Sequence, residues 1–165
     1  MLADMFMQTG AVFSPCKTYR YRLWRTWDTT KKPIVFLMLN PSIADENQND
    51  PTVERCQRRA MAMQYGSLQV TNIFALVSTD PAGLYSCEDP VGPGNNAAIL
   101  DAVKDAGMVI CAWGTHGKHQ ARAKEVVDML RNAGVTPHCL GQNDDGSPKH
   151  PLYVAYSKTP QPFNW

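Results

Sequence analysis

The stretch Pro33–Ser42, PIVFLMLNPS, sets the organisation of the whole chain. It contains a continuous apolar run, Ile34–Leu39, followed directly by Asn40-Pro41-Ser42. A short apolar run is typical of a strand buried on both faces of a parallel sheet, whereas a membrane-spanning helix needs roughly 20 apolar residues. Because open α/β sheets bind ligands beyond the carboxyl ends of their strands, we expect Asn40 to lie at a functional site. The alternative is that Asn40-Pro41 only opens a turn.

Length and composition predict one globular domain. The 165 residues, 44% hydrophobic and 19% charged, suffice to bury a core without disulfides or metal. The five cysteines are scattered without a C-x-x-C pair, which favours a reducing cytoplasm over a disulfide framework or a zinc site. A net charge of +1 means that any nucleic-acid surface must be local. We expect a monomeric, cytoplasmic protein without cofactor, metal or membrane segment.

Strand and helix patterns alternate along the chain. Strands are predicted at residues 19–27, 67–74, 108–113 and 135–140, and helices at about 51–65, 95–106 and 118–132. This order predicts an α/β fold with three layers, α/β/α, around a central, mainly four-stranded parallel sheet. We expect residues 1–165 to form a single domain, in which residues 1–15 are a peripheral lead-in that adds a strand or hairpin to the core at 16–165.

The sequence also predicts helix caps, helix faces and one long loop. Asp50 is expected to cap the first helix, which begins at Pro51 and carries arginines on or beside its exposed face, at Arg55, Arg58 and Arg59. The helix at 95–106 is expected to be capped by Asn95 or Asn96 and to bury Ile99, Leu100 and Val103. The long loop at 78–95 is either functional or mobile.

The segment from Lys17 to Lys32 interleaves basic and aromatic residues. Its alternation predicts a strand with Tyr19, Tyr21 and Leu23 on one face and Arg20, Arg22 and Trp24 on the other. Basic and aromatic side chains together suit nucleic-acid contacts. The alternative is an edge strand whose charged face is simply solvated.

Polar residues follow four predicted strands, and they would meet at one edge of a parallel sheet. They are Asn40-Pro41, Thr71-Asn72, Trp113-Gly114-Thr115-His116 and, after a loop, His150-Pro151. Two amides and two imidazoles would form a neutral polar site. The chain has no paired-carboxylate, P-loop or G-x-G-x-x-G signature, which disfavours glycoside hydrolysis by two carboxylates, phosphoryl transfer and dinucleotide binding.

These motifs carry a resemblance to a known superfamily. The pattern LNPS…DPT…TN.FA…DPVGP.N…WG.HG…HPLY resembles a bacterial and phage domain family of unknown function, which looks like a divergent branch of the uracil-DNA glycosylases. Asn40-Pro41 is similar to the glycosylase motif that ends the first strand, Asn72 to the base-reading asparagine, CAWGTHGKH to the third motif, and His150-Pro151 to the first half of the last. The departures are Asn40 in place of an aspartate, Met38 in place of a glycine, and Leu152-Tyr153 in place of Ser-Pro.

The resemblance implies a uracil-DNA-glycosylase-like fold and a set of roles. Asn40 would orient the attacking water, and His150 would donate to the departing base as an oxyanion hole does. Asn72 would contact the edge of the base, and Phe74 or Tyr65 would stack on it. Asp45 or Asp50 would supply the missing carboxylate, unless Asp50 is only a helix cap. The remaining supporting positions are Pro41, Ser42, Trp113, His116 and Pro151.

Three functions stay open on this basis. The first is a DNA-glycosylase-like hydrolase that cleaves the N-glycosidic bond of a modified or mismatched base. The second is a non-catalytic module that binds a modified base or nucleotide on the same fold. The third is an enzyme that acts on free nucleotides, which fits the near-neutral charge. DNA, or a nucleotide or nucleobase, is therefore the expected partner.

Overall fold

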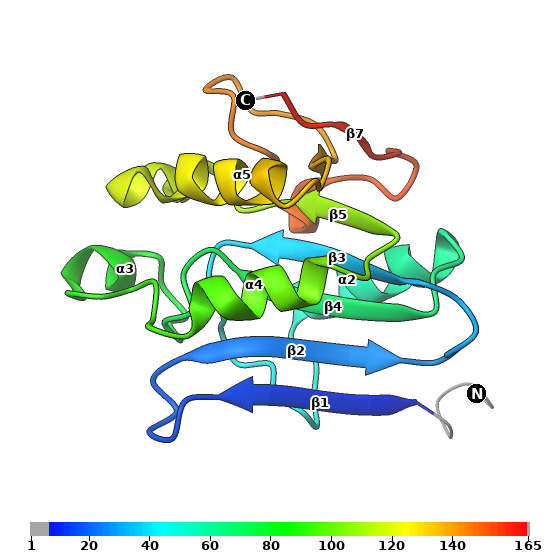
Figure 1. The fold of residues 1–165 in the computed structure, drawn as a ribbon, viewed down its shortest axis with the longest axis horizontal. Coiled ribbons are helices and arrows are strands. Elements are labelled where there is room, and N and C mark those ends of the chain that lie inside the picture. The colour runs from blue at the N-terminus through cyan, green and yellow to red at the C-terminus, as the bar shows by residue number, and fades with distance from the viewer. Residues whose placement is uncertain (1–6, 165) are drawn as a thin grey trace.

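The protein has a mixed α/β fold built on one seven-stranded sheet (Figure 1). The structure, a computed structural model, describes residues 7–164. The strands are β1 Gln8–Phe13, β2 Arg20–Thr26, β3 Pro33–Met38, β4 Ser67–Asn72, β5 Met108–Cys111, β6 His138–Cys139 and β7 Gln161–Pro162. The α-helices are α2 Pro51–Ala62, α3 Ala82–Ser86, α4 Asn95–Val103 and α5 Arg122–Asn132, and two 3₁₀ segments are η1 Thr115–Ala121 and η2 Pro151–Tyr153.

Four strands form the parallel centre of the sheet. The sheet order is β1-β2-β4-β3-β5-β6-β7, in which β4, β3, β5 and β6 run parallel and the flanking pairs are antiparallel. The predicted buried strand is confirmed, because Ile34–Leu37 has no exposed surface in β3. Met38 pairs with Asn72, so β3 and β4 end at the same level. Their polar extensions therefore start side by side.

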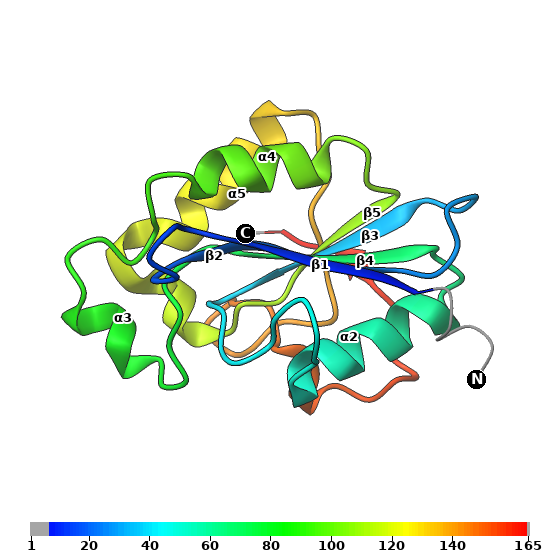
Figure 2. The same ribbon diagram turned by 90° about the horizontal axis from the view of Figure 1, so that it is seen from below.

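Helices cover both faces of the sheet (Figure 2). The α4 and α5 helices lie on one face and α2 on the other, and Ile34 and Phe36 pack in the cluster that includes residues of α2. Val35 and Leu37 point to the opposite face and pack with residues of α4 and α5. Because successive strand residues face opposite sides, a strand between two helical layers must be apolar throughout. This explains the unbroken run in β3.

The first helix begins as predicted. The Asp50 side chain accepts a hydrogen bond from the Val53 amide over 2.8 Å, and Pro51 occupies the first helical position. The predicted exposure of Arg59 is wrong, because its side chain is only 2% exposed. It donates to the carbonyls of Val154, Ala155 and Lys158, and these bonds compensate for burial of the guanidinium.

Other details differ from the sequence-based expectations. The β2 strand is not at the edge of the sheet, because β1 pairs with it on the outer side. The fourth parallel strand is reduced to two residues, and the 78–95 loop contains α3. Gly94, not an asparagine side chain, precedes α4, and Leu100 is 39% exposed. Residues 1–6 of the predicted lead-in lie outside the described residues.

Candidate functional site

A pocket of about 620 Å³ lies at the carboxyl ends of β3, β4 and β5. Its volume is within the range of small-molecule sites, about 300–1,000 Å³. The pocket collects residues from several distant segments, which is what parallel strands with level ends predict. Seven of the residues selected from the sequence line it, namely Asn40, Ser42, Asp50, Asn72, Trp113, His116 and His150.

Asn40 has a fixed side-chain orientation. Its Nδ2 donates to the carbonyl of Ser78 over 2.8 Å and lies 3.1 Å from that of Pro41 and 3.4 Å from that of Leu76. Three carbonyl acceptors around one amide nitrogen identify it as the donor end. The Oδ1 atom is the remaining polar atom of the side chain. Asn40 can therefore orient a donor such as water, although an amide cannot take its proton.

His150 is held as a neutral imidazole. Its Nδ1 accepts a hydrogen bond from the amide of Leu152 over 3.3 Å, so the proton of the neutral ring lies on Nε2. Burial lowers the pKa of His150 below its ordinary value, and the nearby charge of Asp50 opposes this shift only in part. At neutral pH the side chain can donate one hydrogen bond from Nε2 to an acceptor on a ligand.

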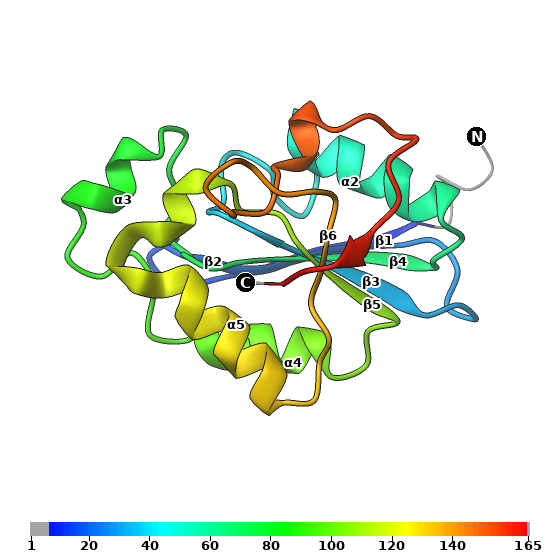
Figure 3. The ribbon, with the colours of Figure 1, turned by 90° about the horizontal axis from the view of Figure 1, so that it is seen from above.

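The segment that carries His150 lies beside α2 (Figure 3). Arg55 of α2 donates to the carbonyl of Val154 over 2.6 Å and to that of Pro151 over 3.2 Å. Its guanidinium also lies over the ring of Tyr156, 4.4 Å from the centroid. These contacts fix the backbone that follows His150, so the arginine near the exposed face of α2 has a structural role.

Asp50 lies where both of the alternatives left by the sequence stay possible. It caps α2 through Oδ1, and it is the one carboxylate among the described residues that line the 620 Å³ pocket. Asp45 does not line the pocket. Its Oδ1 accepts hydrogen bonds from the amides of Asn47 and Gln48 at 2.8 and 3.0 Å, and these bonds lower the pKa of Asp45. Any carboxylate chemistry in the pocket therefore falls to Asp50.

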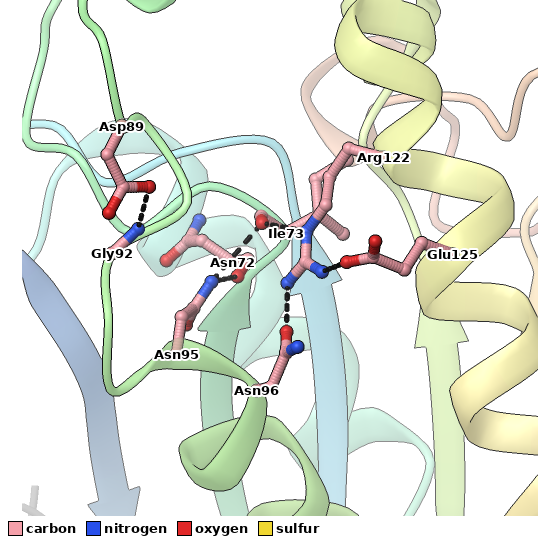
Figure 4. Close-up of polar contacts among 8 residues, drawn as sticks. All are labelled: Asn72, Ile73, Asp89, Gly92, Asn95, Asn96, Arg122 and Glu125. Carbon is pink, nitrogen blue, oxygen red and sulfur yellow. Dashed lines mark hydrogen bonds and ion pairs between the residues drawn. The ribbon is translucent and has the colours of Figure 1, made fainter.

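Asn72 is fixed from behind by α4 (Figure 4). The Nδ2 of Asn95 donates to the carbonyl of Asn72 over 2.8 Å and to that of Ile73 over 3.2 Å. The side chain of Asn95 is fully buried, which explains why it bonds to the end of β4 instead of capping its own helix. Asp89 stabilises the loop before α4 by accepting from the amide of Gly92 over 3.1 Å.

Arg122 completes this network from α5. Its Nε donates to the carbonyl of Ile73 over 2.7 Å and one terminal nitrogen donates to Oδ1 of Asn96 over 2.7 Å. The other terminal nitrogen pairs with Glu125. All three nitrogens of the guanidinium have partners, and the bond from Nε ties the backbone after β4 to α5 (Figure 4).

The sequence did not identify Arg20 as a residue of this site. Arg20 is 2% exposed and lines the pocket. One terminal nitrogen donates to the carbonyl of Ala44 over 2.8 Å, and the other lies 3.4 Å from Oδ1 of Asn72. Burial lowers the pKa of Arg20 to about 10. The missing information was that the loop carrying Ala44 lies against Arg20, because alternation alone predicts an exposed arginine.

Two residues expected to stack on a base lie outside the pocket. Phe74 has no exposed surface and packs in the core beneath α4 and α5. Tyr65 lies before the start of β4, at the opposite end of the strand from Asn72. Pro41 and Pro151 also do not line the pocket. A stacking role for Phe74 or Tyr65 is therefore corrected, because neither ring faces the pocket.

His116 and Trp113 border the pocket from the segment after β5. The hydroxyl of Tyr85 on α3 lies 2.9 Å from Nδ1 of His116, which ties the 78–95 loop to η1. Trp113 is 1% exposed and packs edge-on against Phe163, with centroids 5.8 Å apart. Trp113 thus belongs mainly to the wall, whereas His116 links the wall to the loop.

Residues 7–164 contain neither a candidate metal cluster nor a helix that could span a membrane. Within that range no three His, Cys, Asp or Glu side chains are grouped so that they could hold a metal ion. No helix there has the length and apolar content needed to cross a membrane. The five cysteines are unpaired, and Cys56, Cys111 and Cys139 are buried.

The sequence was also compared with known proteins. Residues 20–152 match the model of the family described as Protein of unknown function (DUF1643). No curated protein and no solved structure matches the chain. The matched range includes β2 to β6 and all the strand ends that form the pocket. The chain therefore belongs to the DUF1643 family.

Proposed function

We propose that the pocket binds a nucleotide and hydrolyses its N-glycosidic bond, with a modified or mismatched base in DNA as the first substrate to test. The observation that carries the proposal is the convergence of Asn40, Asp50, Asn72 and His150 on one pocket. Together they offer an amide acceptor, a carboxylate, a second amide and a neutral imidazole donor. The motif resemblance to the uracil-DNA glycosylases supports the same reaction.

The proposed step uses these groups in complementary ways. A water molecule held by Oδ1 of Asn40 attacks C1′ of the sugar while the bond from C1′ to the base nitrogen breaks. The bonding electron pair leaves with the base, and Nε2–H of His150 donates to a base oxygen on which negative charge develops. The carboxylate of Asp50 takes the proton of the water. The products are the base anion, which takes up a proton from solvent on release, and the sugar hemiacetal, while Asp50 returns its proton to solvent.

A base-release assay tests this proposal directly. Oligonucleotides that carry uracil, mismatched thymine, hypoxanthine or a hydroxymethylated pyrimidine are incubated with the wild-type protein, and abasic sites are counted. We expect His150→Ala to lower the release rate about 10²–10³-fold, as loss of one oxyanion-hole donor does. The matched control is His138→Ala, because His138 lies on β6 and does not line the pocket. Equal rates for the two variants would contradict the assigned role.

A non-catalytic binding module is the second candidate. The observation that favours it is the side chain of Asn40, an amide with its nitrogen committed to backbone carbonyls. Salt-sensitive DNA binding without base release from any of the four substrates would support the module and overturn the hydrolase. Asp50→Asn sharpens the distinction, because it removes the proposed base and should abolish turnover while binding persists. Asp128→Asn, an exposed change on α5, is its control.

A further inference from the structure

The buried arginines of the protein differ in how many of their guanidinium nitrogens make hydrogen bonds. Four arginines are at most 3% exposed, namely Arg20, Arg25, Arg59 and Arg122. In Arg25 and Arg122 all three guanidinium nitrogens have hydrogen-bond partners. In Arg20 the Nε atom is buried and has no hydrogen-bond partner among the residues that the structure describes. Arg20 is also the member of this group that lines the pocket.

Arg20 lacks a compensating negative charge in the described structure. No carboxylate among residues 7–164 lies within ion-pair distance of it, and Asp50 and Asp45 favour its charged form only through space. Its two partners are the neutral oxygens of Ala44 and Asn72. A buried charge is costly unless it is paired and hydrogen-bonded. A ligand anion in the pocket would supply that missing partner.

Two further features of the pocket also favour a bound anion. Lys149 lines the pocket, as do Thr52 and Val53 in the first turn of the 12-residue helix α2, whose positive end favours anions. Asp50 opposes this with one negative charge, and its Oδ1 is already committed to the helix cap. Two cations against one carboxylate, with His150 neutral, leave the pocket suited to a negatively charged group.

We infer that Arg20 forms an anion subsite in the pocket and that the ligand is a nucleoside monophosphate whose terminal phosphate binds there. The identity of the nucleoside rests on the proposed function, and the anion subsite rests on Arg20. Arg20 is 2% exposed and lines the pocket, so a ligand would meet its guanidinium from within the pocket. A terminal phosphate can end at that wall, whereas a phosphodiester must continue on both sides. Arginine also suits phosphate, because its planar donors match two phosphate oxygens.

Titration calorimetry with three kinds of ligand tests this inference. Wild-type protein is titrated with inorganic phosphate, with pyrimidine and purine nucleoside monophosphates, and with the corresponding nucleosides. We expect at least one monophosphate to bind about tenfold or more tightly than its nucleoside, as a charge-assisted contact predicts. Arg20→Met should remove this difference between the monophosphate and its nucleoside. Arg22→Met is the control, because Arg22 lies on the same strand but pairs with Asp101 outside the pocket.

A measurement without variants keeps the test valid if Arg20→Met does not fold. The melting temperature of the wild type is followed as sodium phosphate replaces sodium chloride at constant ionic strength. We expect phosphate to raise it in a concentration-dependent way, because a ligand that binds only the native state stabilises that state. No phosphate effect together with equal binding of monophosphate and nucleoside would overturn the inference.

The outcomes also separate this inference from the proposed function. Base release from oligonucleotides without any preference for monophosphates would uphold the hydrolase and overturn the terminal-phosphate site. Tight binding of an oligonucleotide, with no preference for the monophosphate over the nucleoside, would also overturn it and point to a backbone phosphate. Arg20-dependent monophosphate binding without base release from DNA or from the monophosphate would uphold the anion subsite and overturn the hydrolase.

Discussion

Arg20 and Arg122 are both buried near the end of β4, yet their bonding differs. Arg122 joins α5 to the carbonyl of Ile73 and has partners on all three guanidinium nitrogens. Within residues 7–164, Arg20 has two hydrogen-bond partners, the neutral oxygens of Ala44 and Asn72. Arg122 supports the backbone after β4 and does not line the pocket, whereas Arg20 lines it. Incomplete bonding of a buried cation thus separates a group that supports the fold from one available to a ligand.

We expect the largest effect from a substitution that removes the hydrogen bonds of Arg122. Arg122→Met removes one of the two side-chain donors to the carbonyl of Ile73 and the donor to Oδ1 of Asn96, so we expect a loss of about 2–4 kcal/mol in the free energy of unfolding. Arg20→Met should change it by about 1 kcal/mol or less, because removing an unpaired buried charge offsets the lost hydrogen bonds. Urea unfolding of both variants measures the contrast, with Arg58→Met as an exposed control. Equal losses at both sites would break the comparison.

The side-chain amide of Asn95 holds the same end of β4 as Arg122 does. Asn95→Ala removes the donor to the carbonyls of Asn72 and Ile73, and we expect a loss of about 1–3 kcal/mol in the free energy of unfolding. Asn132→Ala, at the exposed end of α5, should have a negligible effect. A thermal unfolding curve for each variant provides the measurement. Identical curves would show that α4 does not hold the end of β4.

Asp50 separates stability from function on the pocket side. Asp50→Ala should cost about 1 kcal/mol of stability, because it removes the hydrogen bond to the amide of Val53. Asp50→Ser retains a cap without the carboxylate, so it should keep nearly wild-type stability and still lose base release. The comparison needs urea unfolding and the release assay on the same preparations. If Asp50→Ser remained fully active, Asp50 would be only a cap.

The smallest effect concerns the pH dependence of His150. Its pKa is lowered in the folded protein by burial, so the unfolded state binds the proton more readily. Stability should therefore be complete above about pH 6.5 and should fall as the pH drops below that value toward the lowered pKa of the folded state. Urea midpoints between pH 7.5 and 5 measure this trend. His150→Ala should show a shallower decline than wild type, and an unchanged slope would contradict the assignment.

Apolar runs and capping residues predicted much of the fold, because each depends on residues that are close together in the sequence. The unbroken apolar run of β3 is explained by helical layers on both faces, and Asp50-Pro51 marks the start of α2 by capping chemistry. The periodicity of a segment predicted burial less well where residues distant in the sequence pack against that segment. Arg59 is buried because its carbonyl partners come from residues 154–158, which no pattern within α2 indicates.

The candidate site divides in the same way. The sequence by itself determined that four polar residues follow strands or turns, namely Asn40, Asn72, His116 and His150. Because parallel strands bring their carboxyl ends to one edge of the sheet, these residues were expected to meet there. The tertiary structure decided that Phe74 and Tyr65 lie away from the pocket and that Arg20 lies within its wall. Burial and hydrogen-bond saturation depend on which distant segments pack together, and a linear pattern of residue types does not contain that information.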